Sequence, residues 1–248
     1  VGLLDLIALA VLGLVAIGVN AGINRVLLRA LGARIGPGEA YALSAAGTWM
    51  NTMLPLQGGA AGRAVYLKHR HGVAYSHFVA VQGATYAFSF LIGSVIAAIL
   101  WGVITLSGVK LTPVLLALCV LLTVGTLFLL VTPLPRWTPR NRFTRVVLSV
   151  IDGWKTLRGP RLAVTIGGLL VVNLLVAALR FGVAFAALGQ PVGARMILFL
   201  AVLVSMSQVV RITPGNLGVR EAVSGALAES IHADFGVGVM ASVLIRLV

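Results

Sequence analysis

Apolar runs long enough to cross a lipid bilayer recur along this chain and restrict its fold to few possibilities. Examples are Leu3 to Ile23, Phe78 to Leu106 and Leu162 to Leu188. A helix needs about 20 mostly apolar residues to span a bilayer. Backbone groups in lipid must pair with one another, which leaves helices or closed barrels, and runs of this length fit helices. We therefore predict an all-α, polytopic helical membrane protein.

The composition supports this prediction and argues against a nucleic-acid partner. Hydrophobic residues make up 59% of the chain and charged residues 10%, whereas charged residues approach about a quarter of a soluble domain. The net charge of +13 comes from basic residues between the apolar runs, without the interleaved aromatic residues of a nucleic-acid groove. We expect no nucleic acid, and an integral protein of a prokaryotic cytoplasmic membrane.

The segment 133–161 carries the densest positive charge, which places it on the cytoplasmic side by the positive-inside rule. Apolar residues recur within it at helical spacing opposite the charges, from Phe143 to Leu157. This pattern predicts an amphipathic helix on anionic lipids of the inner leaflet. Docking of a protein partner at the same helix is the alternative.

Two shorter segments are interrupted where a span would continue. The segment from Gly36 to Gly72 is broken at Pro55, and the segment from Met196 to about Ile231 is broken at Pro214. Broken backbone at membrane depth is tolerated only where it is buried in protein or lines a cavity. We interpret both segments as re-entrant broken hairpins, the first entering from the cytoplasmic side and the second from outside.

The order of spans and hairpins indicates an inverted-topology repeat within one domain, 1–248. Repeat one covers about 1–131, the basic linker about 133–161, and repeat two about 162–248. Such repeats place their substrate site near the bilayer midplane, at the discontinuous helices. Because both ends look trimmed, we expect repeat two to be truncated, while the sequence leaves open whether further helices or a soluble domain belong at either end.

The breaks also predict where an anion would bind. Each break starts a short helix, whose N-terminus offers unpaired N–H groups and a positive dipole. Arg63 and Arg220 follow one to two turns later and could add charge-assisted contacts to phosphate oxygens. Asn51 could hydrogen-bond either the freed backbone or the headgroup.

Paired motifs at the breaks resemble those of the lysylphosphatidylglycerol synthase transmembrane region, or flippase-like domain family. They are Asn51-x-x-x-Pro55-x-x-Gly58-Gly59-x-x-x-Arg63 and Pro214-Gly215-x-x-Gly218-x-x-Glu221. The resemblance implies a membrane domain that moves a lipid between leaflets and assigns roles at these positions. The lipid would be an anionic or aminoacylated phospholipid or a polyprenyl-phosphate-linked lipid. The resemblance also implies a separate or fused lipid synthase domain as a partner. The synthase activity would belong to that domain and is not assigned to this chain.

Several intramembrane charges have two interpretations from sequence. Arg220 and Glu221 either pair with each other or with Arg211 to neutralise a helix start, or bind the headgroup. Arg180 either extends toward the outer surface or faces the cavity. Arg246 fits an interfacial anchor better than a ligand.

We find no nucleophile with a paired base, no metal-ligating cluster and no cofactor motif, so we expect no enzyme activity. The predicted function is a lipid flippase-like transporter. A non-transporting lipid-binding scaffold or accessory subunit of a lipid-modifying synthase is the alternative, and a lipid transferase using Arg220 and Glu221 is a weaker one. The candidate substrate-binding residues are Asn51, Pro55, Gly58, Gly59, Arg63, Arg180, Arg211, Pro214, Gly218, Arg220 and Glu221.

Overall fold

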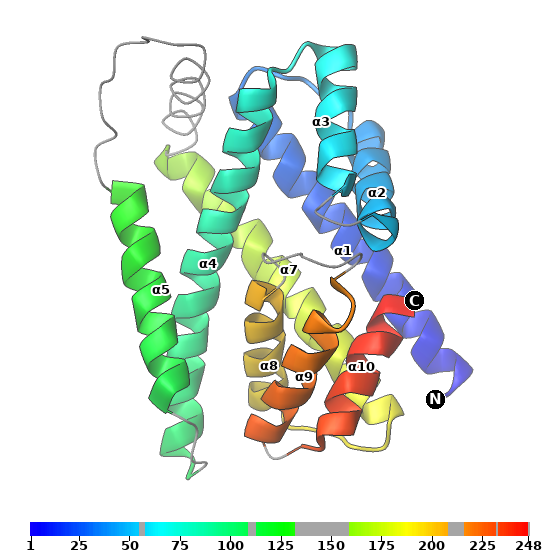
Figure 1. The fold of residues 1–248 in the computed structure, drawn as a ribbon, viewed down its shortest axis with the longest axis vertical. Coiled ribbons are helices and arrows are strands. Elements are labelled where there is room, and N and C mark those ends of the chain that lie inside the picture. Colours follow the sequence, from blue (N-terminus) through cyan, green and yellow to red (C-terminus); the bar gives the residue numbers. More distant parts are fainter. Residues whose placement is uncertain (55–57, 109–112, 132–158, 208–215, 232, 248) are drawn as a thin grey trace.

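The computed structural model of the chain describes residues 1–54, 58–108, 113–131, 159–207, 216–231 and 233–247. Within these ranges every regular element is a helix (Figure 1). The helices are α1 (Leu3–Ala30), α2 (Pro37–Met53), α3 (Gly58–His71), α4 (Tyr75–Leu106), α5 (Pro113–Val131), α7 (Pro160–Ala187), α8 (Ala194–Ser207), α9 (Val219–Ser230) and α10 (Phe235–Leu247).

Helices α1, α4 and α7 are long and apolar enough to cross a bilayer. Helices α5, α8 and α10 contain shorter apolar segments. Large apolar side chains are exposed along the outside, for example Val11 at 52%, Val164 at 76% and Leu121 at 68%. In water such a surface would be unfavourable, whereas lipid tails accept it. The prediction of an all-α, polytopic membrane protein is confirmed.

The long helices form the frame of the molecule. Helices α1 and α7 lie side by side and run obliquely through it in opposite directions, and α4 lies beside α5 (Figure 1). One buried cluster centres on α8, where Phe199 and Leu200 are fully enclosed. The other joins α1 to α4 through residues such as Ile23, Leu27 and Val81. The interior therefore consists of two apolar regions rather than one.

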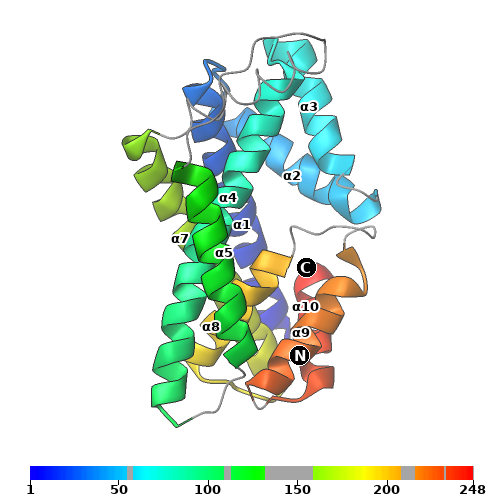
Figure 2. The same cartoon turned by 60° about the vertical axis from the view of Figure 1, so that its left-hand side comes forward.

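The shorter helices occupy opposite halves of this frame. In both views α2 and α3 lie in the upper half, and α8, α9 and α10 lie in the lower half (Figures 1 and 2). The chain leaves α2 after Met53 and enters α3 at Gly58, which matches the predicted first break. Two opposed hairpins would produce this placement, while their re-entry into a membrane and the inverted-repeat symmetry stay predictions.

Glycines let the paired short helices approach very closely. A methyl group added to Gly59 on α3 would overlap the carbonyl oxygen of Gly47 on α2. Between α9 and α10, a methyl group on Gly238 would lie 2.6 Å from the carbonyl oxygen of Ser224. Backbone-to-backbone contact of this kind is the usual function of glycine in membrane helix pairs. It fixes the position of α3 on α2 and of α10 on α9.

Candidate functional site

A cavity of about 1090 Å³ lies between the two halves of the molecule. Its walls come from α1, α2, α3, α4 and α7, and from α9 and α10 with one residue of α8, Ser205. Small-molecule sites commonly measure about 300 to 1000 Å³. The cavity is therefore larger than a phosphate ion requires and has room for a headgroup around it.

Four arginines line this cavity from four different helices. They are Arg63 on α3, Arg180 on α7, Arg220 on α9 and Arg246 on α10. None of the described residues that line the cavity is an aspartate or a glutamate. Three of the four were candidates from sequence, and the fold brings them together although they are far apart in the chain. The arrangement produces a positive electrostatic potential that favours an anion.

Arg180 and Arg246 show how tertiary structure settles alternatives that the sequence left open. Arg180 faces the cavity, and its Nη2 donates a hydrogen bond to the backbone oxygen of Ile245 over 2.6 Å. Arg246 was expected as an interfacial anchor, but it also lines the cavity. Helix α10 packs against α9 and α7, and this contact turns Arg246 inward.

Glu221 joins α9 to α10. Its Oε1 lies 2.8 Å from Nη2 of Arg246 in an ion pair, and its Oε2 accepts a hydrogen bond of 2.8 Å from the backbone N–H of Gly218. The ion pair that the structure places at Glu221 is therefore with Arg246, a partner that the sequence analysis did not consider. Gly218 has a φ of 81°, which glycine adopts without strain. This conformation lets the carboxylate reach back to the start of its own helix.

Asn51 has a comparable role at the first hairpin. Its Oδ1 accepts a hydrogen bond of 2.9 Å from the backbone N–H of Gly59, and its side chain also lines the cavity. Of the two interpretations of Asn51, the structure shows the contact with the backbone. Gly58 and Gly59 form the first turn of α3, so the amide of Asn51 satisfies an N–H group that the helix itself cannot. Arg63 follows on the same helix and reaches the cavity.

Of the uncharged polar residues that line the cavity, sequence reasoning identified only Asn51 as a candidate. The chain has six asparagines, and the five in the described residues all line the cavity: Asn20, Asn24, Asn51, Asn173 and Asn216. Helix α4 adds Gln82, whose Nε2 donates a hydrogen bond to the hydroxyl oxygen of Tyr86 over 3.1 Å. These residues recur at helical spacing within apolar helices. Asn20 and Asn24 are one turn apart, and so are Gln82 and Tyr86. This spacing places the polar side chains on one face of each helix, and it was the feature of the sequence from which the polar lining could have been predicted.

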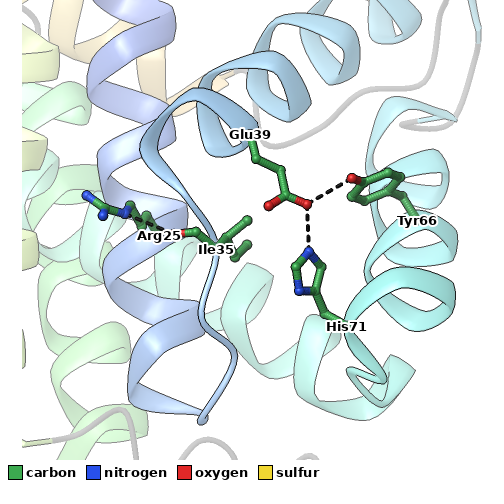
Figure 3. Close-up of polar contacts among 5 residues, drawn as sticks. All are labelled: Arg25, Ile35, Glu39, Tyr66 and His71. Carbon is green, nitrogen blue, oxygen red and sulfur yellow. Dashed lines mark hydrogen bonds and ion pairs between the residues drawn. The ribbon is translucent and has the colours of Figure 1, made fainter.

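A second polar cluster lies away from the cavity, where α2 begins and α3 ends (Figure 3). One carboxylate oxygen of Glu39 accepts a hydrogen bond of 2.8 Å from the Tyr66 hydroxyl and lies 2.6 Å from Nε2 of His71. The contact with His71, followed by that with Tyr66, lowers the pKa of Glu39 below its ordinary value. The same carboxylate raises the pKa of Tyr66. The cluster ties the two ends of the hairpin together.

Some predicted features lie outside the described residues. Pro55, Arg211 and Pro214 are among them, and so is most of the basic linker with its predicted amphipathic helix, 143–157. Gly58, Gly59 and Gly218 are described, and each lies at the start of a helix, as the paired motifs predict. Gly59 and Gly218 both donate a backbone N–H to a side chain that lies close to the cavity.

Comparison with known proteins identifies a family. No curated protein and no solved structure matches the chain. A family model described as the lysylphosphatidylglycerol synthase TM region matches residues 2–248. This match and the helices of spanning length fit a membrane protein concerned with lipid. The chain belongs to the lysylphosphatidylglycerol synthase transmembrane-region family.

Proposed function

We propose that the protein is a flippase-like transporter that moves a lipid with a phosphate-containing headgroup between the two leaflets. The observation that carries this proposal is the cavity between the two halves, with its four arginines on four helices. A charged headgroup crosses hydrocarbon only at high cost. A polar, positively charged cavity within the protein lowers that cost for a phosphate.

The arrangement of the lining supports movement rather than binding alone. Arg63 belongs to the upper hairpin, and Arg220 and Arg246 belong to the lower helices (Figure 2). A phosphate held between these groups would contact both halves at once. If one half rocks against the other, the same site opens toward each leaflet in turn, as in transporters with repeated halves. The acyl tails would remain in lipid, because the outer helical surfaces are apolar.

Leaflet exchange tests the proposal directly. Purified protein would be placed in liposomes that contain fluorescent phospholipid, and dithionite would report how much label reaches the outer leaflet. Arg63→Gln and Arg220→Gln would be compared with Arg195→Gln, which removes an exposed arginine outside the cavity lining. We expect each cavity variant to slow exchange by about ten-fold or more, since each loses charge-assisted hydrogen bonds to phosphate.

The competing function is a lipid-binding scaffold, and the same experiment separates the two. A scaffold would bind labelled lipid without exchanging it. Wild-type protein that binds phospholipid or polyprenyl phosphate yet exchanges neither would refute transport. Exchange that is equal in Arg63→Gln, Arg220→Gln and Arg195→Gln would refute the assignment of the cavity as the route.

A further inference from the structure

The charges around the cavity indicate which lipid headgroup it would bind. This inference rests on the proposed function. Arginine supplies four positive charges to the lining, and the described lining residues supply no negative one. Glu221 lies beside the lining through its contact with Arg246. Even with Glu221 counted, positive charge exceeds negative charge by three among these groups.

Glu221 is not available to a cationic headgroup. Its Oε2 accepts a hydrogen bond from the Gly218 N–H, its Oε1 forms a 2.8 Å ion pair with Arg246 but has no hydrogen bond among the described residues, and the residue is 8% exposed. An ammonium group that bound Glu221 would have to displace Arg246. That exchange would leave a guanidinium in a poorly solvated position with its partner lost, at a cost that a single new ion pair does not recover.

The remaining lining suits a phosphate with neutral, hydroxylated substituents. Asn216 is 3% exposed and lines the cavity, and its Nδ2 and Oδ1 have no hydrogen-bond partner among the described residues. The Nε of Arg180 is likewise without one there. Amides donate to phosphate oxygens and both donate to and accept from hydroxyl groups. An ammonium group finds no compensating charge among these groups and is repelled by the arginines.

We propose that the cavity selects lipids whose phosphate carries no cationic substituent, and that it discriminates against aminoacylated headgroups. Phosphatidylglycerol and polyprenyl monophosphates share the preferred chemistry, an exposed anionic phosphate. Lysyl-phosphatidylglycerol contains the same phosphate with added ammonium groups. Repulsion by the excess positive charge should weaken its binding.

Competition binding tests this selectivity independently of transport. The probe is a fluorescent short-chain phosphatidylglycerol, bound to purified protein in phosphatidylcholine nanodiscs. Unlabelled phosphatidylglycerol, polyprenyl monophosphate and lysyl-phosphatidylglycerol would compete with it. We expect lysyl-phosphatidylglycerol to compete at least about ten-fold more weakly than phosphatidylglycerol, a difference of about 1.4 kcal/mol. Equal or stronger competition by the lysyl lipid would overturn the proposal.

A charge change that preserves shape sharpens the test. Asn173 lines the cavity, and its Oδ1 accepts a hydrogen bond of 3.4 Å from Nδ2 of Asn20, which an aspartate oxygen can also accept. Asn173→Asp should weaken the binding of phosphatidylglycerol to the protein. The ratio of the affinity for phosphatidylglycerol to the affinity for the lysyl lipid should fall by about ten-fold. Gln190→Glu is the control, because Gln190 lies outside the cavity lining and its Oε1 likewise accepts a hydrogen bond, from the Asp234 N–H.

The outcomes distinguish the two proposals. If the lysyl lipid is exchanged between leaflets as fast as phosphatidylglycerol and binds as tightly, the proposed transport is supported and the proposed selectivity is refuted. If phosphatidylglycerol binds preferentially but is not exchanged, the proposed selectivity is supported and the proposed transport is refuted. An unchanged preference in folded Asn173→Asp would show that cavity charge does not set specificity, and would overturn the selectivity.

Discussion

Replacing Gly59 by alanine tests whether the close contact of α2 and α3 holds the upper wall of the cavity. The added methyl group would overlap the carbonyl oxygen of Gly47 and lie 2.7 Å from Oδ1 of Asn51, whereas real Cβ atoms keep at least 3.0 Å from such neighbours. The helices must therefore separate. Overpacking typically costs about 1 to 3 kcal/mol, and loss of a helix cap about 0.5 to 2 kcal/mol. We expect Gly59→Ala to lower the free energy of unfolding by about 2 to 4 kcal/mol.

The free energy of unfolding would be measured by circular dichroism in mixed micelles with increasing sodium dodecyl sulfate. Two glycine variants are matched controls. A methyl group on Gly62 would meet only the flexible end of Met50, and one on the exposed Gly168 would meet nothing within 4 Å. Gly168→Ala should be neutral or stabilising by up to about 1 kcal/mol, since alanine favours helix. The reasoning is refuted if Gly59→Ala and Gly168→Ala unfold at the same detergent fraction.

Three further predictions concern side chains around the cavity and the hairpin. A methyl group on Gly47 would lie 2.8 Å from Nε of Arg63. Gly47→Ala should therefore displace the Arg63 side chain and slow leaflet exchange several-fold while the protein stays folded. An unchanged exchange rate in this variant would contradict the prediction. Glu221→Ala should destabilise by about 3 to 5 kcal/mol in the micelle titration, because it leaves Arg246 without its carboxylate; replacing Arg246 by methionine as well should recover much of the loss. The pKa of Glu39 is lowered in the folded state, so its stabilising contribution is complete above its ordinary value of 4.5 and is lost as the pH falls below it. Glu39→Gln should remove this acid-dependent part, and an identical pH profile in the variant would contradict the assignment.

The helices were largely predictable because lipid imposes length and apolarity on each span. The sequence predicted a first span from Leu3 to Ile23, and the structure extends it to Ala30. The extension includes Arg25, whose Nε donates to the backbone oxygen of Ile35 over 3.1 Å (Figure 3). A helix continues past the apolar run when such a contact satisfies its polar residues. Composition alone does not reveal that contact.

The site was less predictable, because it depends on how helices rotate against one another. The hairpin motifs identified Arg63, Asn51 and Glu221 through their positions near helix starts. The inward orientation of Arg246 depends on the packing of α10, which requires Gly238 to lie against Ser224 and so places Arg246 beside Glu221. No pattern within α10 predicts that pairing.

The contact between Gly47 and Gly59 also limits how the upper hairpin can move. Because the backbones of α2 and α3 are in contact, we expect the two helices to move as one rigid body, which would keep Asn51 and Arg63 in a fixed arrangement. The connection before α2 contains Gly32, with a φ of 85°, and the connection after α3 contains Gly72, with a φ of 66°. If the upper wall of the cavity moves during transport, we expect the backbone at Gly32 and Gly72 to take up the change, outside the helices that carry Asn51 and Arg63.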